Sequence, residues 1–203
     1  MKSAFNRITK DSFNTPVIIV AGGASLIDGK KIEHYRDVIR KLMHGFTGII
    51  ISGGTTAGIP GLAGEVKAEL GQAGKLDFEL IGYLPKSLPD GVTRSESYDS
   101  FCETDAGHFS VLEVLSYWCD IVRSGIDPKD VILLGIEGGE IAAMEYKIAM
   151  SLGAKVALVA DSGRAASEIL MDKAWKNHPN LLAIPNDPIT FEELQEKFQF
   201  PGL

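Results

Sequence analysis

Short runs of β-branched and other apolar residues recur along the chain, and each stops at a turn built from glycine or other small residues. The clearest runs span residues 17–20, 48–51, 131–134 and 155–159, and weaker ones span 78–83 and 181–184. Their consecutive positions are apolar, as a strand in the middle of a parallel sheet must be when helices cover both of its faces. The pattern therefore predicts a parallel sheet built around these strands.

Stretches with apolar residues at helical spacing separate the strands. They span residues 31–44, 59–73, 109–124, 139–152, 164–176 and 190–198. Strands that alternate with helices are typical of a doubly wound α/β fold, and a chain of 203 residues has the length of one domain. We expect residues 1–203 to form a single Rossmann-like domain, a parallel sheet flanked by helices.

One long stretch, residues 84–107, shows neither pattern and is rich in Pro, Ser, Asp and Gly. A loop of this length in a compact domain is often a lid or a binding loop. A plain surface excursion would have the same composition, so both interpretations stay open at this point.

The charge and the cysteine content exclude several classes of function. The chain has 20 Lys and Arg against 27 Asp and Glu, a net charge of −7, which argues against a nucleic-acid surface. Cys102 and Cys119 belong to no cluster with metal-ligand spacing, so we expect no metal site. The first apolar run is too short for a signal peptide or a membrane span. We therefore expect a cytoplasmic protein, or a soluble part of a longer one that also carries an effector domain.

Small residues follow four of the predicted strands, at the edge where open α/β sheets bind their ligands. Glycine lets the backbone approach a ligand closely, and Ser and Thr add hydrogen-bond donors. The helix that starts near Ile59 would aim its free N–H groups at a phosphate. The predicted ligand-binding residues are Gly22, Gly23, Ala24 and Ser25; Ser52, Gly53, Gly54, Thr55, Thr56, Gly58 and Ile59; Gly138, Gly139 and Glu140; and Asp161, Ser162, Gly163 and Arg164.

The common nucleotide-binding motifs are missing from these turns. No glycine loop is followed by Lys-Ser or Lys-Thr, so the Walker pattern is absent. Gly22-Gly23-Ala24-Ser25 does not have the spacing of a dinucleotide GxGxxG motif, and the second strand ends in Ser52-Gly53-Gly54 instead of an acidic residue. A nicotinamide oxidoreductase is therefore not expected.

The turn after the second strand resembles a known family. Residues 50–65, Ile-Ile-Ser-Gly-Gly-Thr-Thr-Ala-Gly-Ile-Pro-Gly-Leu-Ala-Gly-Glu, are similar to the glycine-rich turn of the SLOG superfamily, which includes DNA-processing protein A and the "lonely guy" phosphoribohydrolases. The resemblance covers about residues 16–184 and is greatest to the branch found in TRPM channels and their prokaryotic relatives. It implies a Rossmann-like domain that binds nucleotide derivatives, such as ADP-ribose, its cyclic isomers or an NAD-related compound.

Enzymes of this superfamily carry a second motif, PGGxGTxxE, which residues 137–145 match only in part. Gly138, Gly139 and Glu145 agree, whereas Glu137 replaces the proline, and Ile141 and Ala142 replace the Gly-Thr pair. No arginine occurs between Tyr98 and Val122, where the enzymes have one. The resemblance thus implies a binding or sensor domain without catalysis. The alternatives are a nucleotide N-glycosidase that uses Glu145, and a structural domain with a relic pocket.

Other residues have plainer interpretations. Arg164 could bind a phosphate with two hydrogen bonds from its guanidinium at the start of its helix, which Asp161 or Ser162 could cap. Tyr117 and Trp118 are expected in the core or in a subunit contact. Apolar residues on more than one helix face predict a homodimer through residues 112–118 or 141–148. Besides the nucleotide-derived ligand we expect no cofactor, no nucleic acid and no membrane partner.

Overall fold

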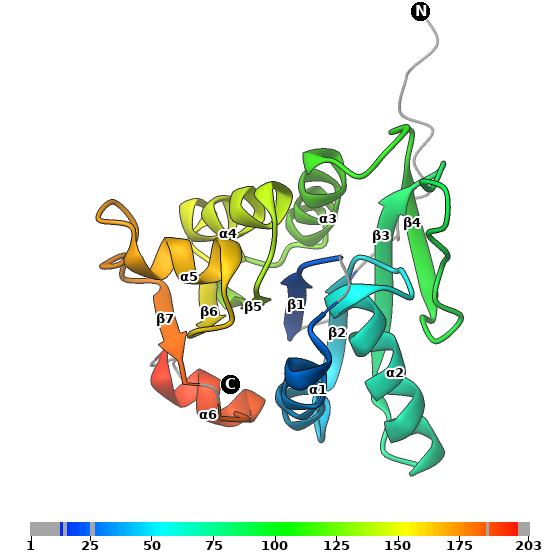
Figure 1. Cartoon of the computed structure of the whole chain (residues 1–203), viewed down its shortest axis with the longest axis horizontal. Coiled ribbons are helices and arrows are strands. Elements are labelled where there is room, and N and C mark those ends of the chain that lie inside the picture. Colours follow the sequence, from blue (N-terminus) through cyan, green and yellow to red (C-terminus); the bar gives the residue numbers. More distant parts are fainter. Residues whose placement is uncertain (1–12, 14–15, 25–26, 186, 199–203) are drawn as a thin grey trace, which may run out of the picture.

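A computed structural model describes residues 13, 16–24, 27–185 and 187–198 of the chain. Its centre is a seven-stranded sheet with the order β4-β3-β2-β1-β5-β6-β7 (Figure 1). All neighbouring strands pair in parallel, which confirms the predicted sheet. The strands are β1 (Val17–Gly22), β2 (Thr47–Ser52), β3 (Asp77–Pro85), β4 (Ser100–Thr104), β5 (Val131–Ile136), β6 (Lys155–Val159) and β7 (Leu181–Ile184).

Helices cover both faces of the sheet, three on each (Figure 1). Alternate residues of β1 point to opposite faces: Ile18 and Val20 pack with α1, α2 and α6, whereas Val17 and Ile19 pack with α3, α4 and α5. The central strands are therefore buried on both sides, which explains their unbroken apolar runs. The helices are α1 (Gly29–Met43), α2 (Gly58–Gln72), α3 (Val111–Arg123), α4 (Glu140–Leu152), α5 (Arg164–Met171) and α6 (Phe191–Lys197).

The strand order reverses its direction beside β1. From β1 the chain winds outward through β2, β3 and β4, and then α3 carries it back to β5 on the other side of β1. In a doubly wound sheet the helices on the two sides of this point diverge, and a crevice opens at the carboxyl ends of the strands. The topology thus predicts a ligand site above β1 and β5.

The stretch 84–107 holds a strand that the sequence did not indicate, β4. Because β4 lies at the sheet edge, it does not need the continuous apolar run of a central strand. The loop between β3 and β4 is tied to the start of α2: Thr55 forms an antiparallel bridge with Arg94, and the Tyr98 hydroxyl donates to the Pro60 carbonyl over 2.8 Å. This anchoring favours the plain structural interpretation of the loop over a lid.

The predicted helices agree with the structure within two residues at most of their ends. The exception is α5, expected to reach residue 176, which ends at Met171 because Asp172 adopts an extended backbone conformation. Within the described residues, no helix combines the length and the apolar character that crossing a membrane requires.

Candidate functional site

A cavity of about 390 Å³ opens at the carboxyl ends of β1 and β2, between the first turns of α3 and α4. This is the place that the reversal of the strand order predicts. Nine of the predicted ligand residues line it: Gly22, Gly23, Ala24, Ser52, Gly53, Thr55, Gly139, Glu140 and Arg164. Eight others lie outside the cavity wall: Gly54, Thr56, Gly58, Ile59, Gly138, Asp161, Ser162 and Gly163. Ser25 is not among the described residues.

Two of the glycines outside the cavity are needed for packing. A Cβ on Gly54 would come within 2.7 Å of the Leu84 side chain and 3.1 Å of the Gly82 backbone, and one on Gly58 would come within 2.0 Å of the Gly23 carbonyl. Both glycines also have positive φ. Thr56 likewise serves the fold, because its hydroxyl pairs with that of Thr93 over 2.9 Å. These contacts give Gly54 and Thr56 a role in packing, and the expectation that they contact the ligand stays a prediction.

The first turn of α2 is not the source of free donors that the sequence suggested. The Ile59 N–H donates to the Gly23 carbonyl over 2.8 Å, and the Gly61 N–H donates to Ala57 over 3.2 Å. Pro60 has no N–H to offer. The start of α2 is therefore largely satisfied within the protein and has little left for a phosphate.

The first turn of α4 does present free donors to the cavity. Its N-cap residue, Gly139, makes no side-chain cap, and no acceptor within the described residues faces the N–H groups of Glu140, Ile141 and Ala142. All three residues line the cavity. The N–H groups and the positive end of the helix dipole make this turn suited to an anion.

The start of α5 holds the α4 turn in place. The Ala165 N–H donates to the Gly138 carbonyl over 3.2 Å, and the Ala166 N–H donates to the Glu137 carbonyl over 2.9 Å. Because these bonds use the first N–H groups of α5, its contribution to the cavity is the side chain of Arg164.

Arg164 lies across the cavity edge between two glycines. Its Nη1 is 3.6 Å from the position of a Cβ on Gly23, and its Nη2 is 3.4 Å from that on Gly139. Among the described residues, no carboxylate forms an ion pair with this guanidinium. The residue also has a φ of 52°, a strained conformation of the kind that gathers at functional sites.

Glu145 lines the cavity one turn farther along α4. The hydroxyl of Tyr117 on α3 donates to its Oε1 over 2.9 Å. Burial raises the pKa of Glu145 to about 7, and the hydrogen bond from Tyr117 offsets only part of this shift. The carboxyl group thus exchanges its proton near neutral pH, in contact with the cavity.

The wall formed by α3 was missed by the sequence analysis. It consists of Phe109, Ser110, Glu113, Val114 and Tyr117. Ser110 and Glu113 form a capping box, a spacing that is visible in the sequence and marks where this helix begins. Combined with the strand order, that signal would have placed the start of α3 at the cavity.

Tyr83 of β3 forms a further part of the wall that the sequence did not suggest. Its hydroxyl donates to Asp120 Oδ2 over 2.6 Å, and burial raises the pKa of Tyr83 well above its ordinary value. Within the part of the chain that the structure describes, no group of acidic, His and Cys side chains could hold a metal ion.

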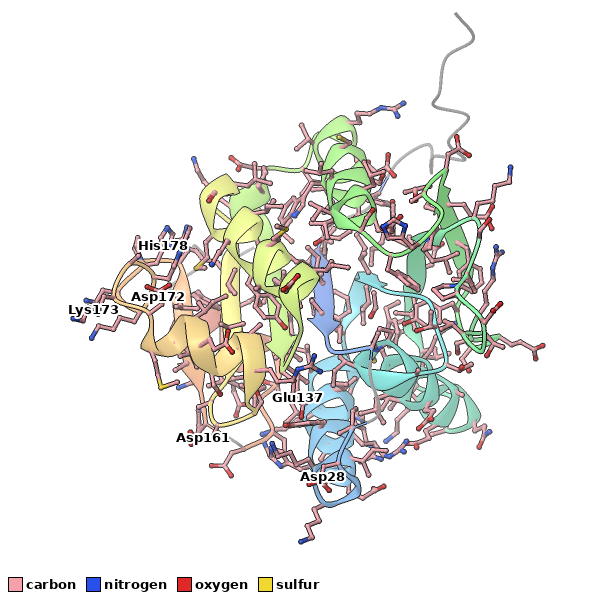
Figure 2. The ribbon with its side chains drawn as sticks, turned by 45° about the horizontal axis from the view of Figure 1, so that its top comes forward. Asp28, Glu137, Asp161, Asp172, Lys173 and His178 are labelled. Atoms are coloured by element: carbon pink, nitrogen blue, oxygen red, sulfur yellow. The ribbon has the colours of Figure 1, made fainter. Side chains whose placement is uncertain are left out.

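A second set of polar residues lies beyond Arg164, where β5 and β6 end. The Tyr35 hydroxyl donates to Glu137 Oε1 over 3.1 Å, and Lys31 Nζ donates to the Ser162 carbonyl over 3.0 Å. The Ser162 hydroxyl donates a hydrogen bond to the Val159 carbonyl over 2.8 Å. Ser162 therefore closes the turn after β6, and Asp161 points outward at the edge of the molecule (Figure 2).

Residues 15–198 match the protein family described as SLOG in TRPM, prokaryote. No curated protein matches the chain. Among solved structures, the molybdenum cofactor binding protein of Rippkaea orientalis is 17% identical with a TM-score of 0.59, over 93% of this chain and 98% of that one. The molybdenum cofactor carrier protein of Chlamydomonas reinhardtii is 19% identical with a TM-score of 0.58, over 84% and 89%. DNA processing protein A of Streptococcus pneumoniae is 13% identical with a TM-score of 0.58, over 91% and 62%. At these identities the likenesses show the fold.

Proposed function

The chain belongs to the family described as SLOG in TRPM, prokaryote, and from that premise we propose that it is a binding domain for a nucleotide-derived small molecule. The candidate ligands are ADP-ribose, a cyclic ADP-ribose isomer and an NAD-related compound, and the domain binds them without catalysis. One observation carries this proposal. The Arg164 guanidinium, which has no carboxylate partner among the described residues, lies beside the free N–H groups at the start of α4.

These two groups suit a phosphate or diphosphate. Backbone N–H groups at a helix start can donate hydrogen bonds to an anion without a neighbouring cation, and a guanidinium adds a planar pair of donors. Apolar side chains, including Phe109, Val114 and Ile141, form part of the remaining wall and offer a surface for a base. A volume of about 390 Å³ lies in the range of small-molecule sites.

The test is a ligand screen followed by a titration. Thermal shift with ADP-ribose, NAD and the cyclic ADP-ribose isomers should raise the melting temperature for at least one compound. The molybdenum cofactor belongs in the same screen, because two of the similar structures are named for it. If only that cofactor binds, or if no compound does, the proposed ligand class is wrong.

The titration should then compare the wild type with Arg164→Gln and Arg164→Lys. Loss of a charged hydrogen bond to phosphate should weaken binding by about tenfold or more for glutamine, and by less for lysine, which keeps the charge. Arg123→Gln is the matched control, because Arg123 lies at the far end of α3 and is largely exposed. Equal affinity of wild type and Arg164→Gln would contradict the proposed anion site.

A nucleotide N-glycosidase is the second candidate, favoured by one observation. Glu145 reaches the cavity with a pKa near 7, as a general acid at neutral pH requires. In that reaction the bond from the anomeric carbon to the base nitrogen breaks, Glu145 gives the leaving base its proton, and water adds to the anomeric carbon and returns a proton to the Glu145 carboxylate. Release of free base from nucleoside monophosphates by wild type, and its loss in Glu145→Gln, would favour this enzyme over a binding domain.

A further inference from the structure

Three polar atoms from two different segments converge on the empty space beside Gly23. A Cβ placed on Gly23 would be 3.6 Å from Arg164 Nη1, 3.7 Å from the Gly138 nitrogen and 3.8 Å from Glu137 Oε2. Gly23 is the residue that leaves this space open, since any side chain there would fill it. The space lies at the edge of the cavity, and Gly23 and Arg164 belong to both.

Each of the three groups has hydrogen-bonding capacity that the protein leaves unused. Glu137 Oε1 accepts from the Tyr35 hydroxyl and lies 4.0 Å from Lys31 Nζ, whereas no described donor bonds to Oε2. The N–H of Gly138 likewise has no acceptor among the described residues. The Glu137 side chain is only 13% exposed, and its Oε2 is not fully buried, so this oxygen stays accessible to a ligand at the cavity edge.

The backbone supports the same interpretation. Glu137 has a φ of 55° and Arg164 one of 52°, a left-handed conformation that is unfavourable for a non-glycine residue. Glycine would avoid this strain at either position, and strained residues of this kind gather at functional sites. Figure 2 shows Glu137 where the start of α5 comes near α1, inward from Asp28 and Asp161.

The chemistry of the three groups selects the ligand atom that fits between them. Arg164 and the Gly138 N–H are donors, and the Glu137 carboxylate is an acceptor that carries negative charge. A phosphate oxygen accepts hydrogen bonds only and would be repelled by Glu137. A hydroxyl group satisfies all three, because it accepts from the two donors and donates its proton to Oε2.

We propose that the space beside Gly23 is a subsite for a sugar hydroxyl, in which Glu137 selects ribose over deoxyribose. The inference rests on the proposed function, because it supplies the sugar of the same ligand whose phosphate lies at the start of α4. Glu137 contacts the ligand directly in this arrangement, and Tyr35 and Lys31 act as positioning residues that hold its carboxylate. The chain thereby uses Glu137, the residue that replaces the proline of the enzymatic motif.

The experiment measures the affinity of the purified chain for ADP-ribose and for its 2′-deoxy and 2″-deoxy analogues by calorimetry. Whichever ribose lies beside Gly23, the wild type should bind one of the two analogues about tenfold more weakly than ADP-ribose, the effect of one hydrogen bond to a charged group. Glu137→Gln keeps an acceptor for Tyr35 but replaces the second oxygen with a donor. This variant should bind ADP-ribose about tenfold more weakly and lose the discrimination.

A second variant and two controls keep the test decisive. Gly23→Ala fills the subsite with a methyl group at ordinary contact distances, so it should fold and should lose the same discrimination. Asp161→Asn removes a carboxylate from another left-handed residue outside the cavity, and Gly107→Ala adds a Cβ to open space; both should bind as wild type. If wild type and Glu137→Gln bind all three compounds alike, the subsite is wrong and the proposed function stands. If the wild type binds NAD or a cyclic ADP-ribose isomer but none of these three compounds, the subsite for ADP-ribose is wrong and the proposed function stands. If it binds none of the compounds of the screen, the proposed function fails as well.

Discussion

The hydroxyl of Tyr117 donates a hydrogen bond to Oε1 of Glu145 over 2.9 Å and joins α3 to α4 at the cavity wall. The two helices approach from opposite sides of the strand reversal, so this contact bridges the two halves of the sheet. Burial disfavours the charged carboxylate, and one neutral donor compensates for only part of that cost. The site therefore contains a titratable group whose charge depends on pH near 7.

The first prediction is a loss of stability as the pH rises. In the unfolded chain Glu145 loses its proton near its ordinary pKa of 4.5, whereas in the folded protein the pKa is about 7. Between these values the folded state holds more protons, so its stability relative to the unfolded state falls as pH increases. The contribution of Glu145 should fall by about 3 kcal/mol, measured as the difference between wild type and Glu145→Gln in urea unfolding at pH 4.5 and pH 7.5.

Tyr117→Phe is the partner experiment. The Tyr117 hydroxyl lowers the pKa of Glu145, so its removal should move the titration to higher pH without abolishing it. A difference between wild type and Glu145→Gln that stays constant from pH 4.5 to 7.5 would show that Glu145 is not held in a desolvated environment.

The second prediction concerns two glycines that look alike in the sequence. Gly54→Ala places a Cβ 2.7 Å from Leu84 in a backbone with a φ of 74°, so it should cost more than about 2 kcal/mol of unfolding free energy. Gly23→Ala meets only contacts of 3.6 Å or more and should cost less than about 0.5 kcal/mol. Urea unfolding of both variants measures the difference, and equal costs would contradict the division into packing and ligand glycines.

The third prediction is a trade-off between stability and binding at Arg164. Arg164 has a φ of 52°, a conformation that glycine tolerates. Arg164→Gly should therefore raise the free energy of unfolding of the protein by about 1 kcal/mol. The same change removes the guanidinium from the cavity and should weaken the binding of anionic ligands. Thermal unfolding and the ADP-ribose titration are measured on one preparation, with Asp161→Gly as the control for strain alone, since Asp161 has a φ of 56°.

The sequence was sufficient for the parallel sheet, because strands buried on both faces need consecutive apolar residues. It was insufficient for β4, whose edge position relaxes that requirement. Glycine-rich turns indicated the edge of the sheet at which the cavity opens, since parallel strands end together there. They did not separate Gly54, which packs against Leu84, from Gly23, which faces the cavity. That difference depends on what lies opposite each Cα, which is a property of the tertiary structure.

The sequence also could not predict which backbone N–H groups remain free to bind a ligand. The start of α2 has the more glycine-rich turn, but its Ile59 N–H is consumed by the Gly23 carbonyl. The start of α4 keeps its donors because no carbonyl of the residues that the structure describes accepts from them. Arg164 reaches the cavity from a helix far along the chain, so the absence of an arginine between Tyr98 and Val122 did not leave the site without a cation.

The solvent-exposed side of α3 carries no charge over most of its length. Leu112, Leu115 and Val122 are each about half exposed, and Cys119 lies on the same side. Met144 of the neighbouring α4 is 51% exposed. Exposed apolar side chains that gather on one helix face are a feature of interaction sites, so we propose that two copies of the chain pair through α3 and α4.

The last prediction follows from this surface. Light scattering at micromolar concentration should give the wild type twice the mass of one chain. Leu115→Glu should give the monomer mass, because the new carboxylate would be buried without a partner in the interface. Leu76→Glu is the matched control, since Leu76 is an exposed leucine in the turn between α2 and β3 and should leave the dimer intact. A monomer mass for the wild type, or an unchanged mass for Leu115→Glu with a native circular dichroism spectrum, would rule out pairing through α3.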